Sequence, residues 1–268
     1  MTDNDVIATT PQPGVCLLQL NRPTRRNAMS LPAIRQFHQV LDTVLGDSEL
    51  RAIVLTGEGD AFCAGLDLKS VLGPDGRYLL TVQESMDLQQ AFAGVVQRLR
   101  TTNAAVIAAV NGPAVGAGMA LALGADIRFA APQASFHVGA VKIGITAGEC
   151  GISYHLPRLI RAGRAFELML TGRPVLADEA LQIGLVTALV PQERLLDRAF
   201  ECVRQVLANA PYSTAHTKRV MWQNLDAAGL DAAIELENHA QVLGLMTDDF
   251  QEAASAFLQK RNPAFTGR

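Results

Sequence analysis

The chain has few cysteines, few aromatic residues and no run of basic residues. Its four cysteines lie far apart and form no C-x-x-C pair, so the sequence predicts neither a zinc site nor a disulfide framework. Reduced thiols are typical of the cytoplasm, the compartment we expect. With a formal net charge of −3 and no polybasic segment, the chain offers no electrostatic reason to expect nucleic acid or an anionic membrane as a partner. We therefore expect the partner to be a small molecule or another subunit.

Signals for secretion and membrane insertion are weak. Residues 1–14 lack a basic start followed by an apolar run, which argues against a secretory signal. Residues 104–125 are almost free of polar side chains and are long enough to span a bilayer. Asn111-Gly112-Pro113 interrupts this stretch as a turn. We therefore expect a buried strand over residues 105–110, then an alanine-rich helix, and no membrane span.

Apolar residues are abundant, at 49% of the 268 residues, which is enough for one large core. Short apolar runs alternate with amphipathic segments in the first half, and this pattern predicts an α/β fold. The expected strands and helices of this half are residues 15–20, 52–56, 105–110 and 127–130, and residues 31–45 and 86–99. From about residue 161 the pattern is mostly helical. We expect an α/β core over residues 1–192 and a helical region over residues 193–268.

Two familiar motifs match only in part. The glycines of residues 112–118 suggest a dinucleotide-binding turn, but they run G-x-x-x-G-x-G, so a nicotinamide or flavin site is not expected. Gly151 and Ser153 begin like the nucleophile elbow of a serine hydrolase, yet His155 stands where the motif needs a second glycine. The five histidines show no metal-ligand spacing. We expect Ser153 to be structural and no metal site.

Two glycine-containing segments can each present a free backbone N–H to one ligand atom. The first, residues 62–67 (FCAGLD), carries small side chains that let a ligand approach the main chain. The second, residues 111–118 (NGPAVGAG), opens a helix whose first N–H groups have no intrahelical partner and whose dipole favours negative charge. Together they could stabilise an enolate oxygen. The residues alone leave open that these glycines only let a helix pack close to a sheet.

Five segments resemble, in order, the crotonase or enoyl-CoA hydratase/isomerase superfamily. They are residues 20–28 (LNRPTRRNA), 62–67, 109–126, 170–173 (LTGR) and 183–186 (IGLV). The resemblance implies a right-handed spiral of ββα units followed by a C-terminal helical trimerisation region. It also implies an acyl-CoA or enoyl-CoA substrate, as in fatty acid metabolism. No metal or redox cofactor is implied, and coenzyme A would arrive as part of the substrate.

The resemblance also implies which residues form the site. The backbone N–H groups of Ala64 and Ala117 would form the oxyanion hole. The residues implied to contact coenzyme A or the substrate are Arg25, Arg26, Ala28, Ala64, Gly65, Leu66, Asp67, Gly116, Phe257 and Lys260. Two adjacent arginines, Arg25 and Arg26, are also typical of a solvated surface pair.

The two glutamates of the family's hydratases are absent, because their positions hold Ala120 and Ala140. Two carboxylates suit hydration, since one activates water while the other exchanges a proton, so the two-glutamate mechanism is not supported. Counting back from Leu156-Pro157 places Glu149 on the acid of dienoyl-CoA isomerases, where one carboxylate could move the proton. A helix-start charge is the alternative for Glu149. We expect an isomerase or atypical hydratase; the alternatives are an inactive acyl-CoA-binding protein and a thioesterase.

The last predicted helix has one apolar face, formed by Phe250, Ala253, Ala254 and Phe257 at helical spacing. By resemblance, this face implies a homotrimer, or a hexamer of two trimers, in which Phe257 packs at an interface. Lys260 would then supply positive charge for the phosphates of coenzyme A. The alternative is that the helix packs on its own domain and that Lys260 is solvated.

Overall fold

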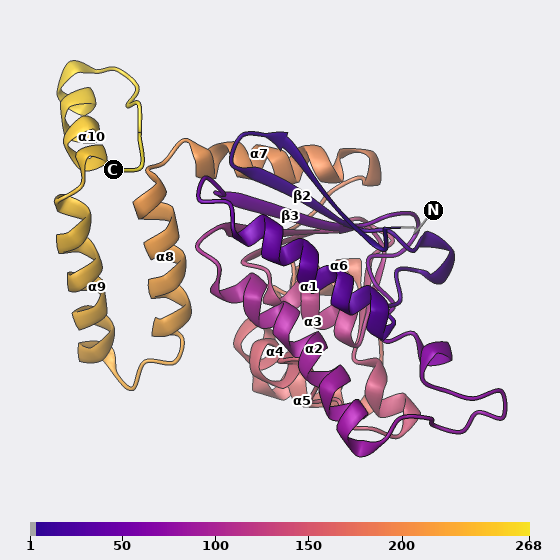
Figure 1. Cartoon of the computed structure of the whole chain (residues 1–268). Coiled ribbons are helices and arrows are strands. Elements are labelled where there is room, and N and C mark those ends of the chain that lie inside the picture. The colour runs from indigo at the N-terminus through magenta and orange to yellow at the C-terminus, as the bar shows by residue number, and fades with distance from the viewer. Residues whose placement is uncertain (1–3) are drawn as a thin grey trace.

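The computed structural model describes residues 4–268 (Figure 1). Its strands are β1 (Val6–Gln12), β2 (Val15–Leu20), β3 (Ala52–Gly57), β4 (Ala105–Val110), β5 (Pro113–Val115), β6 (Ile127–Ala130), β7 (Ser135–His137), β8 (Val175–Leu176) and β9 (Ala188–Leu189). Its α-helices are α1 (Leu31–Leu45), α2 (Val82–Thr101), α3 (Ala117–Gly124), α4 (Ile152–Ile160), α5 (Ala162–Thr171), α6 (Ala177–Gln182), α7 (Leu195–Leu207), α8 (Pro211–Asn224), α9 (Leu230–Leu245) and α10 (Asp248–Gln259). Short 3₁₀ turns include η3 (Gly139–Ile143) and η4 (Gln192–Arg194).

A six-stranded sheet in the order β1-β2-β3-β4-β6-β9 forms the centre of the molecule. Only β1 and β2 pair antiparallel; the other neighbours are parallel. Every residue of β3 is buried, as a parallel strand covered on both faces requires. A smaller sheet in the order β5-β7-β8 lies beside it. Together with the helices, these sheets confirm the predicted α/β fold.

Helices cover both faces of the large sheet. Ile53 and Leu55 belong to the larger core cluster, which also holds the buried residues of α1, α2 and α3. Val54 belongs to the smaller cluster, together with the buried residues of α7. The alternation of strand side chains therefore separates the core into two layers. Since α7 packs on the sheet, residues 193–268 begin with a helix of the sheet's own core; the boundary at residue 192 stays a prediction.

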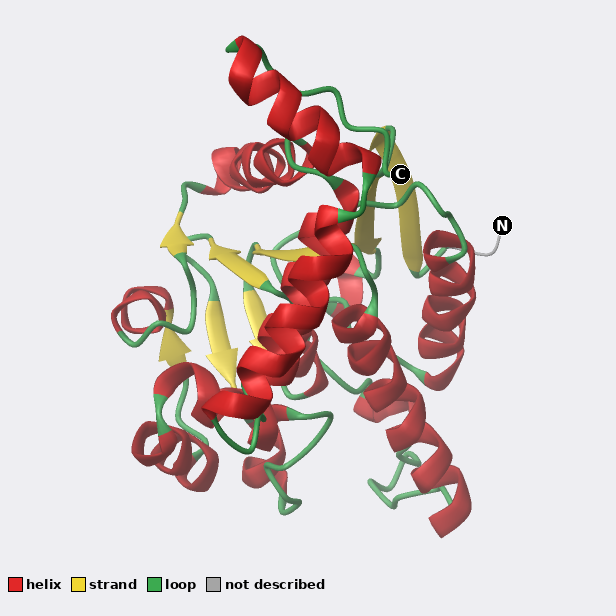
Figure 2. Cartoon of the chain, turned by 90° about the vertical axis from the view of Figure 1, so that its left-hand side faces the viewer, coloured by secondary structure: helices red, strands yellow, loops and turns green. Residues whose placement is uncertain are grey.

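The last three helices, α8, α9 and α10, extend away from the body and are called the arm here (Figure 1). Figure 2, viewed from the side of the arm, shows these helices in front of the strands. Large apolar side chains of the arm are exposed, most of all Phe257 (83%), Leu258 (81%) and Met246 (75%). The predicted apolar face of α10 is thus uncovered within one chain.

The base of the arm is held to the body by Lys218 of α8. Its ammonium lies 2.9 Å from a carboxylate oxygen of Asp126 and donates to the carbonyls of Leu99 (3.1 Å) and Ala104 (2.9 Å). Trp222, one turn further along α8, donates its indole N–H to the same carboxylate at 2.7 Å. These contacts fix α8 against the end of α2 and the start of β4 and β6.

His155, the fourth residue of α4, is buried behind this base with 4% exposure. Burial, and then the nearby charges of Arg100, Arg128 and Arg158, lower the pKa of His155 to about 4. Above the unfolded-state pKa of about 6.5, both folded and unfolded forms are neutral, so His155 has no effect on stability there. As the pH falls from that value towards 4, only the unfolded state takes up the proton, and stability is lost.

We expect His155→Gln to remove this acid sensitivity. Wild-type chain should lose up to about 3 kcal/mol more unfolding free energy than His155→Gln between about pH 7 and pH 4, as measured by urea titration. His239→Gln is the control, because the His239 side chain is 70% exposed and lies on the arm. Equal losses in wild type and His155→Gln would show that His155 is not held neutral.

Candidate active site

The two predicted glycine segments come together in the structure. Cys63 and Ala114 form an isolated parallel bridge. The N–H of Val115 donates to the Cys63 carbonyl at 2.9 Å, and the N–H of Cys63 donates to the Pro113 carbonyl at 3.1 Å. Residues 62–65 therefore lie along β5 and the turn that leads into α3.

Glycine is required where these segments touch. A Cβ atom on Gly118 would lie 2.1 Å from the Cys63 carbonyl oxygen, and one on Gly65 would lie 2.6 Å from the Val115 carbonyl oxygen. Gly116 has φ +53°, a conformation that L-residues rarely adopt. Close packing is thus one role of these glycines, and any role in binding depends on the N–H groups beside them.

The backbone N–H of Ala117 is available to a ligand. Ala117 is the first residue of α3, so its N–H has no intrahelical acceptor, and it donates no hydrogen bond to any residue between 4 and 268. Gly65 packs close to this nitrogen, because a Cβ on Gly65 would lie 3.4 Å from it. The helix dipole adds to the attraction for negative charge.

The second predicted donor, Ala64, is occupied within the chain. Its N–H donates to the carbonyl of Arg26 at 2.9 Å. Arg26 and Asn27 both have positive φ, at 50° and 56°, and this turn directs the Arg26 carbonyl towards Ala64. Ala64 can therefore contribute its N–H to a substrate only if the substrate replaces or shares with that carbonyl.

Glu149 lies beside Gly116, in the turn that leads into α3. A Cβ on Gly116 would be 3.0 Å from Oε1 of Glu149, which places the carboxyl next to the Ala117 N–H. Burial of this half-buried side chain raises the pKa of the Glu149 carboxyl. In the described part of the chain the carboxyl makes no hydrogen bond, and α4 has no side-chain N-cap. The carboxyl thus lies beside Gly116 without capping α4, and both its proton-transfer role and its role as a helix-start charge stay predictions.

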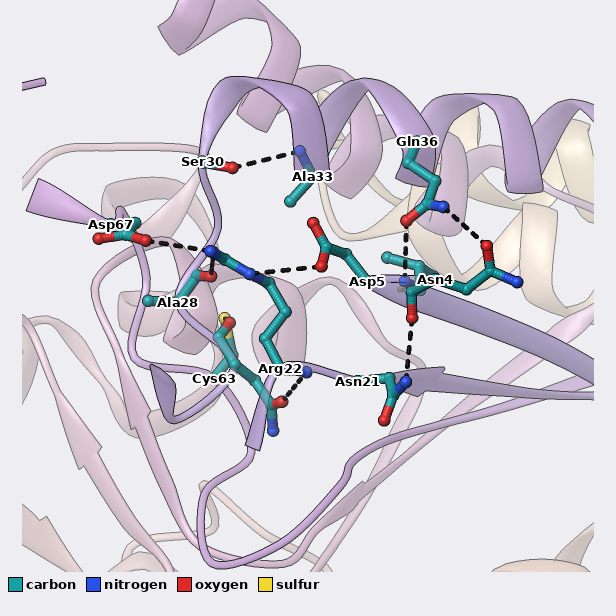
Figure 3. Close-up of polar contacts among 12 residues, drawn as sticks. Asn4, Asp5, Asn21, Arg22, Ala28, Ser30, Ala33, Gln36, Cys63 and Asp67 are labelled. Atoms are coloured by element: carbon teal, nitrogen blue, oxygen red, sulfur yellow. Dashed lines mark hydrogen bonds and ion pairs between the residues drawn. The ribbon is translucent and has the colours of Figure 1, made fainter. Parts of the chain in front are cut away.

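Arg22 links two of the predicted coenzyme A segments, and it was not singled out from the sequence. Arg22 lies 3.4 Å from Asp5 and 3.3 Å from Asp67, and its guanidinium also donates to the Ala28 carbonyl (Figure 3). It joins the predicted coenzyme A segments 20–28 and 62–67 at one point. Opposite charges at Arg22 and Asp67, in two separate motif segments, were the available signal. The Asp67 carboxylate and the Ala28 carbonyl are thus engaged by Arg22.

The other predicted contact residues fall into two groups. Leu66 is half-buried and lies in an isolated bridge with Met29, close to the converged segments, whereas the side chains of Arg25 and Arg26 are exposed. Phe257 and Lys260 lie at the end of α10 in the arm, away from α3 in the same chain (Figure 1). One chain therefore does not bring Phe257 and Lys260 to the site.

The two alanines predicted to stand at the positions of the hydratase glutamates are buried. Ala120 lies in α3 and is fully buried, and Ala140 lies in η3 and is 5% exposed. Neither can donate or accept a proton through its side chain. Glu149 is the carboxylate that the structure places beside Gly116.

A family model for enoyl-CoA hydratase/isomerase matches residues 10–268. The chain belongs to this family, within the crotonase superfamily.

Individual relatives agree. The chain is 41% identical over 258 residues to a probable enoyl-CoA hydratase of Mycobacterium leprae, covering 96% of this chain and 88% of that protein. It is 34% identical over 265 residues to the 1,2-epoxyphenylacetyl-CoA isomerase of Escherichia coli, covering 98% and 99%. The crystal structure of an enoyl-CoA hydratase from Bacillus anthracis superposes with a TM-score of 0.92 at 31% identity, covering 98% and 100%. These matches confirm the predicted crotonase fold and superfamily.

No helix within residues 4–268 combines the length and the apolar character needed to cross a membrane. In the same part of the chain, no three or more histidine, cysteine or acidic side chains are grouped so that they could hold a metal ion.

Proposed function

We propose that this chain is an isomerase or atypical hydratase of enoyl-CoA thioesters that uses Glu149 as its single acid/base. The observation that carries the proposal is the 3.0 Å between Oε1 of Glu149 and the position of a Cβ on Gly116, next to the free N–H of Ala117. A base and an oxyanion donor thus adjoin one point of the surface. This is the arrangement that removal of a proton beside a thioester carbonyl requires.

The proposed reaction moves a proton and conserves atoms. The Glu149 carboxylate takes a proton from the carbon next to the thioester carbonyl, or from the carbon that follows a conjugated double bond. The electron pair moves to the carbonyl oxygen, which gives an enolate. The N–H of Ala117 donates to that oxygen, and the N–H of Ala64 joins it once the substrate displaces the Arg26 carbonyl. Glu149 then returns the proton at another carbon of the same system. One base can serve both steps, whereas hydration also requires a positioned water.

The raised pKa of Glu149 suits this role. Its side chain is desolvated, which brings the carboxyl's pKa closer to the operating pH and makes the return of the proton easier. The proposed reaction requires no metal and no redox cofactor, because it only moves a proton and backbone N–H groups stabilise the enolate. Coenzyme A enters as part of the substrate. We propose the cytoplasm as the compartment.

The alternatives are an acyl-CoA-binding protein without chemistry and an acyl-CoA thioesterase. Turnover and binding of one panel separate them: straight-chain α,β-unsaturated, β,γ-unsaturated and saturated acyl-CoA thioesters. The proposal expects shifted double bonds or hydrated products from the unsaturated members. Binding without turnover would favour the binder, and free thiol release from the saturated members would favour the thioesterase.

We also propose a homotrimer, or a hexamer of two trimers, in which the arm contributes to the coenzyme A site of a neighbouring copy. The exposed Phe257 and the exposed Lys260 at the end of α10 support this, since neither reaches the site of its own chain. Deleting residues 247–268 should then weaken coenzyme A binding and disrupt the oligomer together. A truncated chain that stays trimeric by light scattering and binds coenzyme A normally would contradict the proposal.

A further inference from the structure

Arg100, in the last turn of α2, lies between two aromatic rings from different parts of the chain. Its guanidinium carbon is 4.1 Å from the ring centre of Trp222 and 4.7 Å from that of Tyr154. Its Nη2 donates to the Tyr154 hydroxyl at 3.0 Å, and its Nη1 lies 3.3 Å from Nδ1 of His155. Cation–π contacts and hydrogen bonds thus act on one half-buried side chain.

These rings bring α4 into contact with α8. Tyr154 and His155 belong to α4, and Trp222 belongs to α8 at the base of the arm. The His155 and Trp222 rings meet edge to face with centroids 5.7 Å apart. The Tyr154 hydroxyl also donates to Asp226, just beyond the end of α8. Arg100 therefore clamps the beginning of α4 between α2 and α8.

The clamped turn directly follows the loop that carries Glu149. The carbonyl of Glu149 accepts the N–H of Ile152, the first residue of α4, at 2.8 Å. Cys150 and Gly151 both have positive φ, and a Cβ on Gly151 would lie 3.3 Å from the His155 ring. The path from His155 back to Glu149 is therefore short and tightly packed.

The carboxyl of Glu149 depends on this backbone for its direction. It accepts no hydrogen bond from the described residues, so no side chain within residues 4–268 directs it towards Gly116. A displacement of the beginning of α4 would move Glu149 with nothing to hold its carboxyl in place. Shifts of about 1 Å at a catalytic group can cost roughly 100-fold in rate.

We propose that Arg100 is a positioning residue that holds Glu149 beside Gly116 by clamping Tyr154 and His155 against Trp222. The inference rests on the proposed function, because it assigns Arg100 a role through Glu149. Arg100 does not contact substrate in this account. Its effect on the reaction should therefore disappear when Glu149 can no longer exchange a proton.

The test is a double-mutant cycle on the full-length chain. Arg100→Met keeps an unbranched stem between the rings but removes the cation and its donors. Arg98→Met is the matched control, because Arg98 lies on the same helix and pairs with Asp42 at 2.7 Å and with the His38 carbonyl, towards α1 instead of α4. The probe is the unsaturated acyl-CoA thioester that wild type converts fastest.

We expect Arg100→Met to lower kcat by about 10-fold or more with KM changed less than about threefold, and Arg98→Met to leave both near wild type. In the Glu149→Gln background, Arg100→Met should lower kcat no further. Hydrogen exchange of the amides of residues 146–152 should be faster in Arg100→Met than in Arg98→Met. Trp222 is the only tryptophan of the chain, so its fluorescence reports whether the clamp is intact.

If Arg100→Met does not fold, Tyr154→Phe takes its place. It removes only the hydroxyl, which accepts from Arg100 and donates to Asp226. Equal losses of kcat with and without Glu149, or unchanged exchange of residues 146–152, would overturn the positioning role. Wild-type turnover by Glu149→Gln would instead overturn the proposed function. In that case faster exchange in Arg100→Met would still support the mechanical link to the Glu149 loop, and unchanged exchange would refute it.

Discussion

Replacing Glu149 with glutamine is expected to lower turnover of an unsaturated acyl-CoA thioester by about 100-fold or more. Glutamine keeps the size of the side chain and its place beside Gly116, but it cannot take up a proton. Affinity for a saturated acyl-CoA should stay near wild type, because the carboxyl is not a binding group in this account. Steady-state kinetics and calorimetric binding measure the two effects separately.

The pH profile gives a second test of the same residue. Burial raises the folded-state pKa of Glu149 above its ordinary value of 4.5, and the reaction needs the carboxylate form. Activity should therefore be lost as the pH falls through this raised pKa, so that the acid limb of kcat lies above the range of an exposed glutamate. Glu193→Gln is the control, since Glu193 is exposed in η4. Unchanged turnover of Glu149→Gln would remove Glu149 from the mechanism.

The long elements could be predicted because their local signals agree with their tertiary setting. The apolar runs at residues 15–20, 105–110 and 127–130 are strands with these same bounds. Residues 31–45 form α1, whose start is fixed by the Ser30 hydroxyl accepting the N–H of Ala33. Its amphipathic pattern indicated this helix, so no long-range contact was needed to find it.

Other elements depend on contacts that local sequence does not contain. α4 was missed because Gly151 precedes it and Pro157 lies inside it, both weak helix signals, whereas its burial in the core depends on tertiary packing. β1 was missed because most of its residues are exposed and it has no apolar alternation. β8 has two residues, too few for a periodic pattern.

The site was predictable in its parts and not in its internal geometry. A helix start with small residues indicated free N–H donors in residues 111–118, and the family resemblance implied that Ala117 is one of them. The occupied state of Ala64 depends on the positive φ of Arg26, a tertiary outcome of the turn at residues 22–28. The approach of Glu149 to Gly116 joins positions 33 residues apart, and only the packing of the loop before α4 creates it.

Ala117→Pro is expected to cost about 3 kcal/mol of transition-state stabilisation, or roughly 100-fold in kcat, because it deletes one oxyanion donor. Proline is tolerated at the first position of a helix, where the N–H has no intrahelical acceptor, and Gly116 before it has no Cβ to clash with the ring. The folded state should therefore survive, which thermal unfolding and circular dichroism can establish. Ala117→Gly is the matched control, since it also changes the side chain but keeps the N–H.

The comparison of these two variants separates the loss of the main-chain N–H from the loss of the Ala117 side chain. If the N–H of Ala117 holds the enolate oxygen, Ala117→Gly should keep most of the wild-type kcat, while Ala117→Pro loses it with the fold intact. The proline ring would also occupy space beside Gly65 where the thioester oxygen is expected, so binding of the unsaturated substrate should weaken as well. A folded Ala117→Pro chain with wild-type turnover would mean that the enolate is stabilised elsewhere, because at this position no side chain can replace the lost N–H.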